Sequence, residues 1–371
     1  MTRAVRGVRA VALIDGEHYA PVVRDALAAL PYEWEGAILV GGTEKLREGA
    51  DYGVPLVDGF REAEIVVDLS DEPVLGPRER FEWASRALAA GLPYVGADFR
   101  FDPPELEPFE LPSVSVIGTG KRVGKTAVTT HLARLYARDR NVVVVAMGRG
   151  GPAEPELVEA PPTVEDLVEL SRSGRHAASD HLEIAALAGV PTIGCRRAGG
   201  GLAGGVAVSN VAEGARLAAG LHPDIVIFDG SGASIPPVAT SRRILVTGVA
   251  ERDPYLDAYR RLVSDLVLER PTLRLAPTAP LSGRVAVFTA GATDVSHLDA
   301  DVVHVSTRLA DRAALRNDLV DADTYLVEAK AAGIDVVATY ALERGIEVVL
   351  AANELVGVPD DVLLDLAPVA A

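Results

Sequence analysis

A nine-residue glycine-rich stretch, GTGKRVGKT at Gly118–Thr126, constrains the fold more than any other feature of the sequence. It directly follows the apolar run SVSVI and directly precedes AVTTHLARLY, whose apolar residues recur with a helical period. Between a strand and a helix, such a turn surrounds an anion with backbone N–H groups and the helix N-terminus. The sequence therefore predicts a phosphate-binding loop at the edge of a parallel sheet.

All nine loop residues are expected to contact a nucleotide: Gly118, Thr119, Gly120, Lys121, Arg122, Val123, Gly124, Lys125 and Thr126. Lys125 would reach the β- and γ-phosphates, and Thr126 would bind Mg²⁺, so ATP and Mg²⁺ are the expected cofactors. The chain has only four lysines, and two of them lie in this loop, which indicates a need for a compact ammonium group there.

Composition excludes several classes of function. The chain has 53 acidic and 36 basic residues and a net charge of −17, which argues against a nucleic acid partner. No apolar run is long enough to span a membrane. A single cysteine and an N-terminus without a signal-peptide cleavage site favour a cytoplasmic protein. The sequence leaves the oligomeric state open, with a homodimer as one option.

Apolar strands alternate with amphipathic helices in two series, which predicts an α/β fold of two doubly wound, mainly parallel sheets. We expect a Rossmann-like domain at 1–102, a Pro- and Glu-rich linker at 103–112 and a P-loop core at 113–280. Residues 281–371 would form an α/β extension of that core. Within the core, PYLDAYRRLVSDLVLER at 254–270 is expected to be one long helix.

An acidic residue, Asp229, ends the apolar strand IVIFD and precedes a glycine turn. A carboxylate at this strand end can hold Mg²⁺, directly or through water, opposite Thr126. The alternative is a helix or turn cap. In the first series the strand ends DGEHY and DLSDEP are also acidic, so direct phosphate binding is not expected there.

A second anion site is predicted from basic residues at expected strand ends and loops. They are Arg149, Arg175, His176, His181, Arg196, Arg197 and Lys330. Arginine forks suit phosphate oxygens because two hydrogen bonds form in parallel. The glycines of GGGLAGG, which follow soon after the arginine pair, could cradle an anion with their N–H groups or form a lid.

Each of these residues has a structural alternative. Arg149 can instead pair with a nearby glutamate, and Lys330 with Asp335. The histidines can be caps or surface residues. Arg196 and Arg197 alternate along a strand end, so only one of them can face a ligand.

The five-residue spacing between Gly118 and Gly124, with the later IVIFDGSGA, resembles dethiobiotin synthetase and its P-loop relatives. Longer stretches resemble cyclic 2,3-diphosphoglycerate synthetase across nearly the whole chain: ALIDGEHYAPVVRDAL, VVDLSDEPVL, YVGADFRFDPP, GRGGPAEPELVE, SRSGRHAASDHLEIAALAGVPTIGCRRAGGGLAGG and YLVEAKAAGIDVVA. This resemblance implies ATP-dependent closure of 2,3-diphosphoglycerate into its cyclic phosphoanhydride, with release of ADP and phosphate. The residues expected to take part in catalysis are Lys121, Arg122, Lys125, Arg149 and Asp229.

Two other functions remain open from the sequence. One is a dethiobiotin-synthetase-like enzyme that activates a carboxylate or carbamate, which would need fewer basic residues around a second anion. The other is a P-loop nucleotide switch or metallochaperone. The chain has no guanine-reading Asn-Lys-x-Asp string, and one cysteine with scattered histidines offers no metal cluster.

Overall fold

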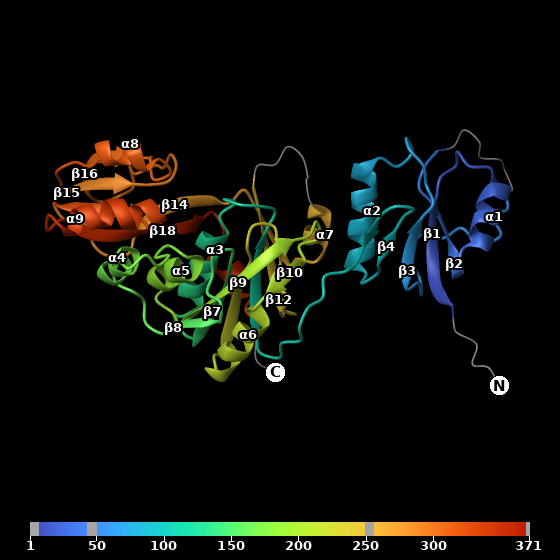
Figure 1. The fold of residues 1–371 in the computed structure, drawn as a ribbon, viewed down its shortest axis with the longest axis horizontal. Helices are drawn as coiled ribbons and strands as arrows, with labels where there is room; N and C mark the ends of the chain where they lie inside the picture. The colour runs from blue at the N-terminus through green and yellow to red at the C-terminus, as the bar shows by residue number, and fades with distance from the viewer. Residues whose placement is uncertain (1–6, 43–49, 249–255, 369–371) are drawn as a thin grey trace. The chain divides into compact units, whose positions relative to one another are not determined.

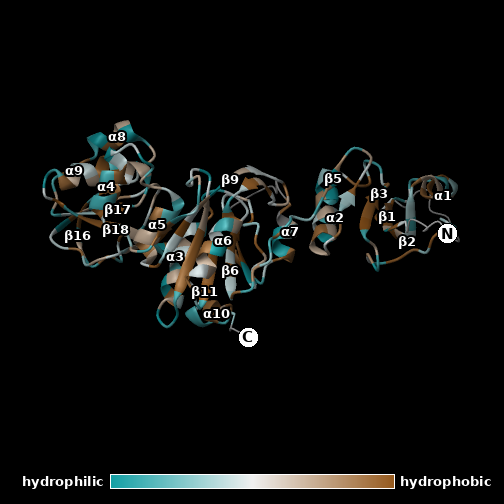
Figure 2. Cartoon of the chain, turned by 60° about the horizontal axis from the view of Figure 1, so that its bottom comes forward, coloured by the Kyte–Doolittle hydropathy of each residue, from teal (hydrophilic) through white to brown (hydrophobic). Residues whose placement is uncertain are grey.

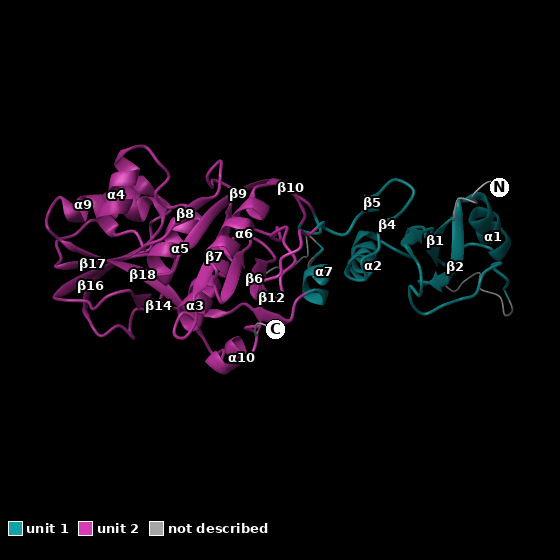
Figure 3. Ribbon diagram, turned by 90° about the horizontal axis from the view of Figure 1, so that it is seen from below, with its two compact units in different colours: residues 1–105, 202–204, 252–263 teal, residues 106–201, 205–251, 264–371 magenta. Residues whose placement is uncertain are grey.

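The computed structural model describes residues 7–42, 50–248 and 256–368. Contacts divide the chain into two compact units (Figure 3). The first comprises Met1–Glu105, Leu202–Gly204 and Arg252–Val263, and the second comprises Leu106–Gly201, Gly205–Glu251 and Ser264–Ala371. Mostly parallel sheets with helices packed on them confirm the predicted α/β class (Figure 1). Within the described ranges, no helix is long and apolar enough to cross a membrane.

The first unit contains a five-stranded sheet of order β2-β1-β3-β4-β5. Its strands are β1 (Val8–Ile14), β2 (Tyr32–Leu39), β3 (Ile65–Asp68), β4 (Tyr94–Val95) and β5 (Arg100–Phe101), and its helices are α1 (Ala20–Ala29), α2 (Pro77–Ala89) and α7 (Asp257–Leu262). The first four strands pair in parallel, and β5 returns antiparallel to β4. Apolar residues fill the centre, and β3 is correspondingly brown in Figure 2.

Two buried carboxylates close the ends of β1 and β3. Asp15 accepts hydrogen bonds from the backbone N–H groups of Glu17, His18 and Asp71, and one of its oxygens lies 2.8 Å from Nδ1 of His18. These donors satisfy the carboxylate within the fold. The acidic strand end DGEHY therefore has a complete structural explanation.

The end of β3 is closed in a similar way. Asp68 accepts hydrogen bonds from the backbone and hydroxyl of Ser70, from Nε of Arg80 at 3.1 Å, and from the hydroxyl of Tyr94 at 2.6 Å. Arg80 also donates to the carbonyl of Ser70. The Asp68 carboxylate thus has both a cationic partner and hydrogen-bond donors. Its contacts stabilise the turn after β3 and the start of α2.

The second unit begins with an eight-stranded sheet of order β10-β9-β7-β11-β6-β12-β13, with β8 paired to β9. The strands are β6 (Ser113–Gly118), β7 (Val142–Gly148), β8 (Glu156–Val158), β9 (Thr192–Gly200), β10 (Val206–Ser209), β11 (Ile225–Asp229), β12 (Arg242–Thr247) and β13 (Leu266–Glu269). Helix α3 (Lys125–Tyr136) packs on one face and α6 (Val211–Gly220) on the other. The sheet is therefore doubly wound, and β6 and β11 are central in it.

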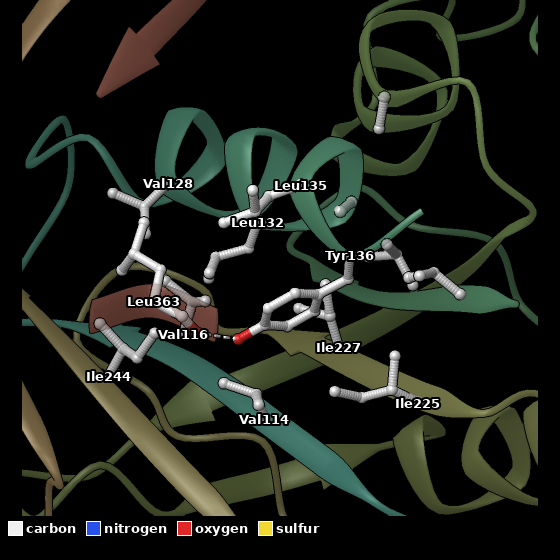
Figure 4. Close-up of a cluster of buried hydrophobic side chains, with 14 of the residues drawn as sticks. Val114, Val116, Val128, Leu132, Leu135, Tyr136, Ile225, Ile227, Ile244 and Leu363 are labelled. Carbon is white, nitrogen blue, oxygen red and sulfur yellow. Dashed lines mark hydrogen bonds between the residues drawn. The ribbon is translucent and has the colours of Figure 1, made fainter. Parts of the chain in front are cut away.

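Helix α3 is anchored by a closely packed apolar cluster (Figure 4). Leu132 and Tyr136 of α3 are fully buried against Val116 of β6 and Ile227 of β11. The Tyr136 hydroxyl donates to the carbonyl of Leu363 in α10 (Asp360–Leu364) at 2.8 Å. Burial of each large apolar side chain contributes about 1.5–3 kcal/mol. This packing fixes the N-terminus of α3 at the carboxyl end of β6.

The C-terminal residues of the second unit form a further five-stranded sheet of order β14-β18-β17-β15-β16. Its elements are β14 (Thr272–Pro277), β15 (Arg284–Phe288), β16 (Asp301–Ser306), α8 (Arg312–Asn317), β17 (Thr324–Glu328), the π-helix η1 (Gly333–Ala338), α9 (Thr339–Leu342) and β18 (Glu347–Val356). Helices α4 (Val164–Arg172) and α5 (Asp180–Ala188) share a buried cluster with β18 and η1. The P-loop sheet and the C-terminal sheet are thereby packed into one unit.

The expected long helix at 254–270 is wrong. Residues 254 and 255 lie outside the described residues, α7 ends at Leu262, and Leu266–Glu269 is β13, paired in parallel with Ile244–Thr247 of β12. A run as short as LVLE fits either a helix or a strand by its pattern. Residues 266–269 form a strand because they pair with β12 at the edge of the sheet.

Two stretches without a predicted helix or strand, the glycine-rich stretch and the predicted linker at 103–112, form strand-like pairings. The glycine-rich stretch is a β-hairpin, because Val206 and Val208 of β10 pair with Gly200 and Ala198 of β9. In the Pro- and Glu-rich segment, Glu107 pairs with Val238. The ring of Phe109 lies 5.2 Å from that of Phe228, so the segment's second half is held on the second unit.

Candidate active site

The glycine-rich loop connects β6 to α3 in a tightly closed turn. Gly124, the residue before the helix, has φ of 100°, and Arg122 has φ of 59°, so both take the left-handed conformation. A side chain at Gly118 would place its Cβ 2.8 Å from Cδ of Lys125 and 2.9 Å from the Val123 side chain. Non-glycine residues with positive φ cluster at ligand-binding turns, as in this loop.

Lys125 is enclosed by the loop that precedes it. Its ammonium group donates to the carbonyl of Gly120 at 2.8 Å, and the residue is only 8% exposed. Burial lowers the pKa of Lys125, while the negative charges of Asp229 and Asp180 oppose that shift. The loop therefore holds a buried cation at its centre, as an anion site requires.

Asp229 ends β11 and faces the first turns of α3. The residue is 2% exposed, and its Oδ1 accepts a hydrogen bond from the Thr129 hydroxyl at 2.7 Å. Burial raises the pKa of Asp229 to about 7, because the Thr129 hydrogen bond only partly offsets desolvation. Thr126 precedes Thr129 by three residues and shares its face of α3. The sequence analysis missed Thr129, which tethers the carboxylate.

Two of the predicted arginines lie close to this centre. Arg149 directly follows β7, is exposed, and has no carboxylate partner within the described part of the chain. Arg197 lies on β9, and its Nη2 donates to the carbonyl of Ser231, two residues after Asp229, at 2.8 Å. The buried Nε of Arg197 has no hydrogen-bond partner among the described residues. Burial and the charge of Arg149 lower the pKa of Arg197, so the two cations lie near each other.

A cavity of about 180 Å³ opens between the carboxyl end of β7 and the N-terminal end of α5. It is lined by Ala146, Gly148, Arg149, Gly150, Gly151, His176, Ala178, Ser179, Asp180 and His181. His181 is 5% exposed, and its Nε2 has no partner in the described ranges. Burial lowers the pKa of His181, which favours a neutral imidazole. A Cβ at Gly194 would lie 2.6 Å from this ring, so only glycine leaves room for it.

Four other predicted basic residues are not part of the lining of this cavity. Arg175 is exposed and forms an ion pair with Glu156 at 3.2 Å. Arg196 is exposed on β9, and its backbone N–H donates to the side chain of Asn210. Lys121 and Arg122 are exposed residues of the loop, and Arg122 lines a cavity that also includes Lys125.

Lys330 is held by a partner that the sequence did not suggest. Its ammonium group donates to Glu183 of α5 at 2.5 Å, whereas Asp335 pairs with Arg312. Glu183 is only 8% exposed. Burial raises the pKa of Glu183, and the charge of Lys330 opposes this shift. The ion pair connects α5 of the P-loop core to the segment after β17.

Sequence reasoning missed the two acids of α5, Asp180 and Glu183. Asp180 lines the 180 Å³ cavity, and its charge acts on the pKa of both Lys125 and Asp229. A detectable signal was present, because both acids lie in DHLEIAALA, an otherwise apolar helix that is buried on nearly all sides. Acids in such a helix need a partner.

Sequence comparison matches all three parts of the chain to one family. Residues 9–102 match its N-terminal domain, 113–272 its P-loop domain and 274–354 its C-terminal domain, each described as cyclic 2,3-diphosphoglycerate synthetase. The chain belongs to the cyclic 2,3-diphosphoglycerate synthetase family. This confirms the resemblance seen in the sequence, and the glycine-rich loop lies within the part of the chain that matches that family's P-loop domain.

Curated relatives are similar along their whole length. The cyclic 2,3-diphosphoglycerate synthetase of Rubrobacter xylanophilus is 46% identical, with 97% of each chain covered. Those of Methanothermus fervidus and Thermococcus kodakarensis are 36% and 40% identical, with 97% and 94% of this chain covered. Among solved structures, LpxK from Aquifex aeolicus in complex with ATP aligns over 71% of this chain and 89% of its own, with 14% identity and a TM-score of 0.42.

Proposed function

We propose that the protein is an ATP-dependent synthetase that closes 2,3-diphosphoglycerate into cyclic 2,3-diphosphoglycerate, releasing ADP and phosphate. The observation that carries this proposal is full-length membership of the family, from the first strand to β18. Beside the P-loop, Arg149 and Arg197 supply positive charge that the loop itself does not use. A nucleotide site next to a second cationic position fits an enzyme that joins two phosphates.

The nucleotide half of the site uses Lys125 for the β- and γ-phosphates, together with the N–H groups of the loop. Thr126 and Asp229 would hold Mg²⁺, because hydroxyl and carboxylate oxygens are the donors that this ion prefers. Burial raises the pKa of Asp229 because its one hydrogen bond and the charge of Lys125 only partly offset desolvation, so a bound cation would stabilise its ionised form. No group of three or more His, Cys, Asp or Glu residues in the described ranges could hold a metal, so phosphate oxygens would complete the coordination. Bound Mg²⁺ would neutralise phosphate charge.

The acceptor half of the site lies around the 180 Å³ cavity. A substrate with two phosphates and one carboxylate carries a charge of roughly −4 to −5. Arg149 and Arg197 would bind its phosphates through charge-assisted hydrogen bonds. His176 and His181 line the cavity, and the unpartnered Nε2 of His181 would gain a partner there.

The route that we propose has two steps. The γ-phosphoryl group of ATP passes to one phosphate of the substrate, which forms a pyrophosphoryl group and releases ADP. The other substrate phosphate then attacks the inner phosphorus, and inorganic phosphate leaves as the cyclic anhydride closes. No side-chain nucleophile is required, so positioning and charge neutralisation carry the catalysis.

Other expected contacts stay predictions. Lys121 and Arg122, which are exposed in the loop, would turn towards the bound phosphates. Arg175 and Lys330 would have to exchange their glutamates for substrate, and Arg196 would have to turn towards the cavity. A cytoplasmic location, a homodimer and the absence of a nucleic acid partner are likewise predictions from composition.

Phosphorus NMR tests the proposed function directly. The protein is incubated with MgATP and 2,3-diphosphoglycerate, and the phosphorus resonances are followed over time. We expect ADP, inorganic phosphate and a phosphoanhydride product in equal amounts. ATP consumption that depends on a carboxylate or carbamate substrate, and not on 2,3-diphosphoglycerate, would favour the dethiobiotin-synthetase-like alternative.

A further inference from the structure

Helix α5 begins at the 180 Å³ cavity without the cap that its sequence allows. Ser179 is its N-cap residue, and Ser179, Asp180 and His181 all line the cavity. A serine at this position normally accepts a hydrogen bond from a backbone N–H of the first turn. The Ser179 side chain makes no such bond, and its hydroxyl is buried with no hydrogen-bond partner among the described residues. The first N–H groups of a helix have no intrahelical acceptor, so donors remain at this end of α5.

Helix α4 shows a completed helix start in the same unit. The hydroxyl of Thr163 accepts from the backbone N–H of Asp166 at 3.1 Å, and the Asp166 carboxylate accepts from the backbone N–H of Thr163 at 2.9 Å. Thr163 is exposed, whereas Ser179 is only 7% exposed. Water can satisfy polar groups at an exposed helix start, but a buried hydroxyl without a partner costs free energy. We therefore expect a ligand to complete the start of α5.

A second unpartnered polar group lies in the first turn of α5. His181 is 5% exposed, and its Nε2 is buried with no partner in the described part of the chain. The ring occupies the space that a side chain at Gly194 would need, because a Cβ there would lie 2.6 Å from it. Burial lowers the pKa of His181, with the charges of Glu156 and Asp180 opposing this shift, so the neutral ring is favoured. A neutral imidazole with its proton on Nε2 is a hydrogen-bond donor that brings no charge.

The groups around the cavity favour a ligand group with a single negative charge. A cavity of about 180 Å³ is smaller than the roughly 300–1,000 Å³ of complete small-molecule sites, so it takes one part of a substrate. Asp180 in the lining disfavours a phosphate group, which carries about −1.5 to −2 charges. Arg149 also lines the cavity, but this residue is exposed and so lies at the opening. A helix N-terminus, a hydroxyl and a neutral imidazole can together satisfy a carboxylate.

We propose that the start of α5, with the Ser179 hydroxyl and the His181 imidazole, binds the carboxylate of 2,3-diphosphoglycerate. Arg149 at the opening and Arg197 then remain for the two phosphates. The inference rests on the proposed function for the identity of the substrate, and it adds a contact for the third anionic group of that substrate. Ser179 would thereby distinguish a diphosphorylated acid from a diphosphorylated alcohol.

Calorimetry with two ligands tests this assignment. One is 2,3-diphosphoglycerate, and the other is propane-1,2-diol bisphosphate, which has a methyl group in place of the carboxylate. Ser179→Ala removes only the hydroxyl that lacks a partner. Thr163→Ala is the matched control, because it removes a hydroxyl that does cap a helix and that lies outside the cavity lining. Urea unfolding of each protein separates an effect on the fold from an effect on binding.

We expect Ser179→Ala to weaken binding of 2,3-diphosphoglycerate at least about tenfold, because a hydrogen bond to a charged group is lost. The wild type should bind propane-1,2-diol bisphosphate more weakly than 2,3-diphosphoglycerate, and Ser179→Ala should bind this analogue as the wild type does. Its unfolding midpoint should stay the same or rise. Thr163→Ala should show the opposite pattern, with a lower unfolding midpoint and unchanged binding of both ligands.

His181→Phe is an independent second variant. It keeps an aromatic ring beside Gly194 and removes the ring nitrogens, so it should also weaken binding of 2,3-diphosphoglycerate and not of the analogue. Equal losses for both ligands would show that the cavity binds a phosphate, and unchanged binding of 2,3-diphosphoglycerate in both variants would show that it binds neither group. Either result overturns the inference. A wild-type protein that binds no 2,3-diphosphoglycerate would refute the proposed function as well, so the two failures can be told apart.

Discussion

Asp15 and Asp229 occupy equivalent places in two different sheets. Each is buried at the carboxyl end of a central parallel strand, β1 in the first unit and β11 in the second. Asp15 accepts three backbone hydrogen bonds and contacts His18, whereas Asp229 accepts one, from Thr129. Burial raises the pKa of Asp15, but its hydrogen bonds outweigh burial and lower the pKa overall. For Asp229 burial prevails.

The difference shows how a structural acid can be told from a functional one within the same architecture. In the described residues of the first unit, the carboxylates of Asp15 and Asp68 are satisfied by groups of the fold, and no buried side-chain N or O atom there lacks a hydrogen-bond partner. Within the described ranges the second unit leaves several buried polar atoms without hydrogen-bond partners, and those at the site are Nε of Arg197, Nε2 of His181 and the hydroxyl of Ser179. Incomplete satisfaction together with a perturbed pKa is typical of a binding site.

The largest expected effect is the loss of Lys125. Lys125→Ala should reduce turnover by about 1,000-fold or more, the scale of losing a cation that stabilises phosphoryl transfer. The fold should persist, because the apolar cluster of α3 does not involve this side chain. Steady-state ATP consumption measures the loss, and circular dichroism checks the fold. Near-normal ATP consumption by the variant would refute the assignment of the loop.

The comparison of acids predicts opposite results for Asp229 and Asp68. Asp229→Asn should slow turnover on the order of 100- to 1,000-fold and weaken the dependence on Mg²⁺. Its free energy of unfolding should stay the same or rise, because the amide keeps the Thr129 hydrogen bond and removes a buried charge. Rates over a Mg²⁺ titration and urea unfolding measure the two quantities.

Asp68→Ala should do the reverse. Removing this carboxylate leaves Nε of Arg80 and the buried hydroxyl of Tyr94 without the acceptor they share, which should cost about 3 kcal/mol of unfolding free energy. Turnover of the folded variant should be normal. If Asp68→Ala slowed turnover as much as Asp229→Asn, the distinction between the two strand ends would be lost.

The next largest effect is expected from removing the arginines of the acceptor half. Arg149→Ala and Arg197→Ala should each weaken binding of 2,3-diphosphoglycerate by roughly 10- to 100-fold, because a charge-assisted hydrogen bond contributes about 1.5–3 kcal/mol. MgADP binding should change little. Arg172→Ala is a matched control, since this exposed arginine pairs with Glu343. Calorimetry that shows weaker MgADP binding and unchanged 2,3-diphosphoglycerate binding would contradict the acceptor site.

The smallest effect concerns pH. The pKa of Asp15 is lower in the folded chain than its ordinary value of 3.8, so its contribution to stability is present above that value. This contribution is lost as pH falls through the folded-state pKa. Asp15→Asn should therefore flatten the acid limb of stability, by at most about 1.4 kcal/mol per pH unit. Thermal unfolding of the wild type and of Asp15→Asn, followed between about pH 5 and about pH 2, measures this loss of stability. If stability fell equally with pH in both proteins, the hydrogen-bond network around Asp15 would be contradicted.

Local sequence patterns predicted the candidate site residues that lie at or directly after the carboxyl end of a strand. The loop of Lys125, the strand end at Asp229 and the position of Arg149 after β7 all follow from apolar runs that stop at a glycine turn. The α/β class followed from the same alternation. These features depend on neighbours in the sequence, so a single chain is enough to read them.

What the sequence did not predict depends on contacts between distant segments. Glu183 meets Lys330 across 147 residues, and Thr129 meets Asp229 across 100. No local pattern contains such pairs. The strand β13 was missed for a related reason, because pairing with β12 and not the intrinsic period of the segment decides its conformation.

The first unit is assembled from three stretches of chain, and this has an evolutionary consequence. Leu202–Gly204, at the tip of the β9–β10 hairpin, and α7 belong to it although both are inserted in the P-loop core. Fully buried Arg260 of α7 donates twice to the carbonyl of Leu202, and α7 packs against α2. A recombination event that exchanged residues 1–105 alone would bring in a domain without these two pieces. The unit can therefore be inherited only together with the core that encodes them.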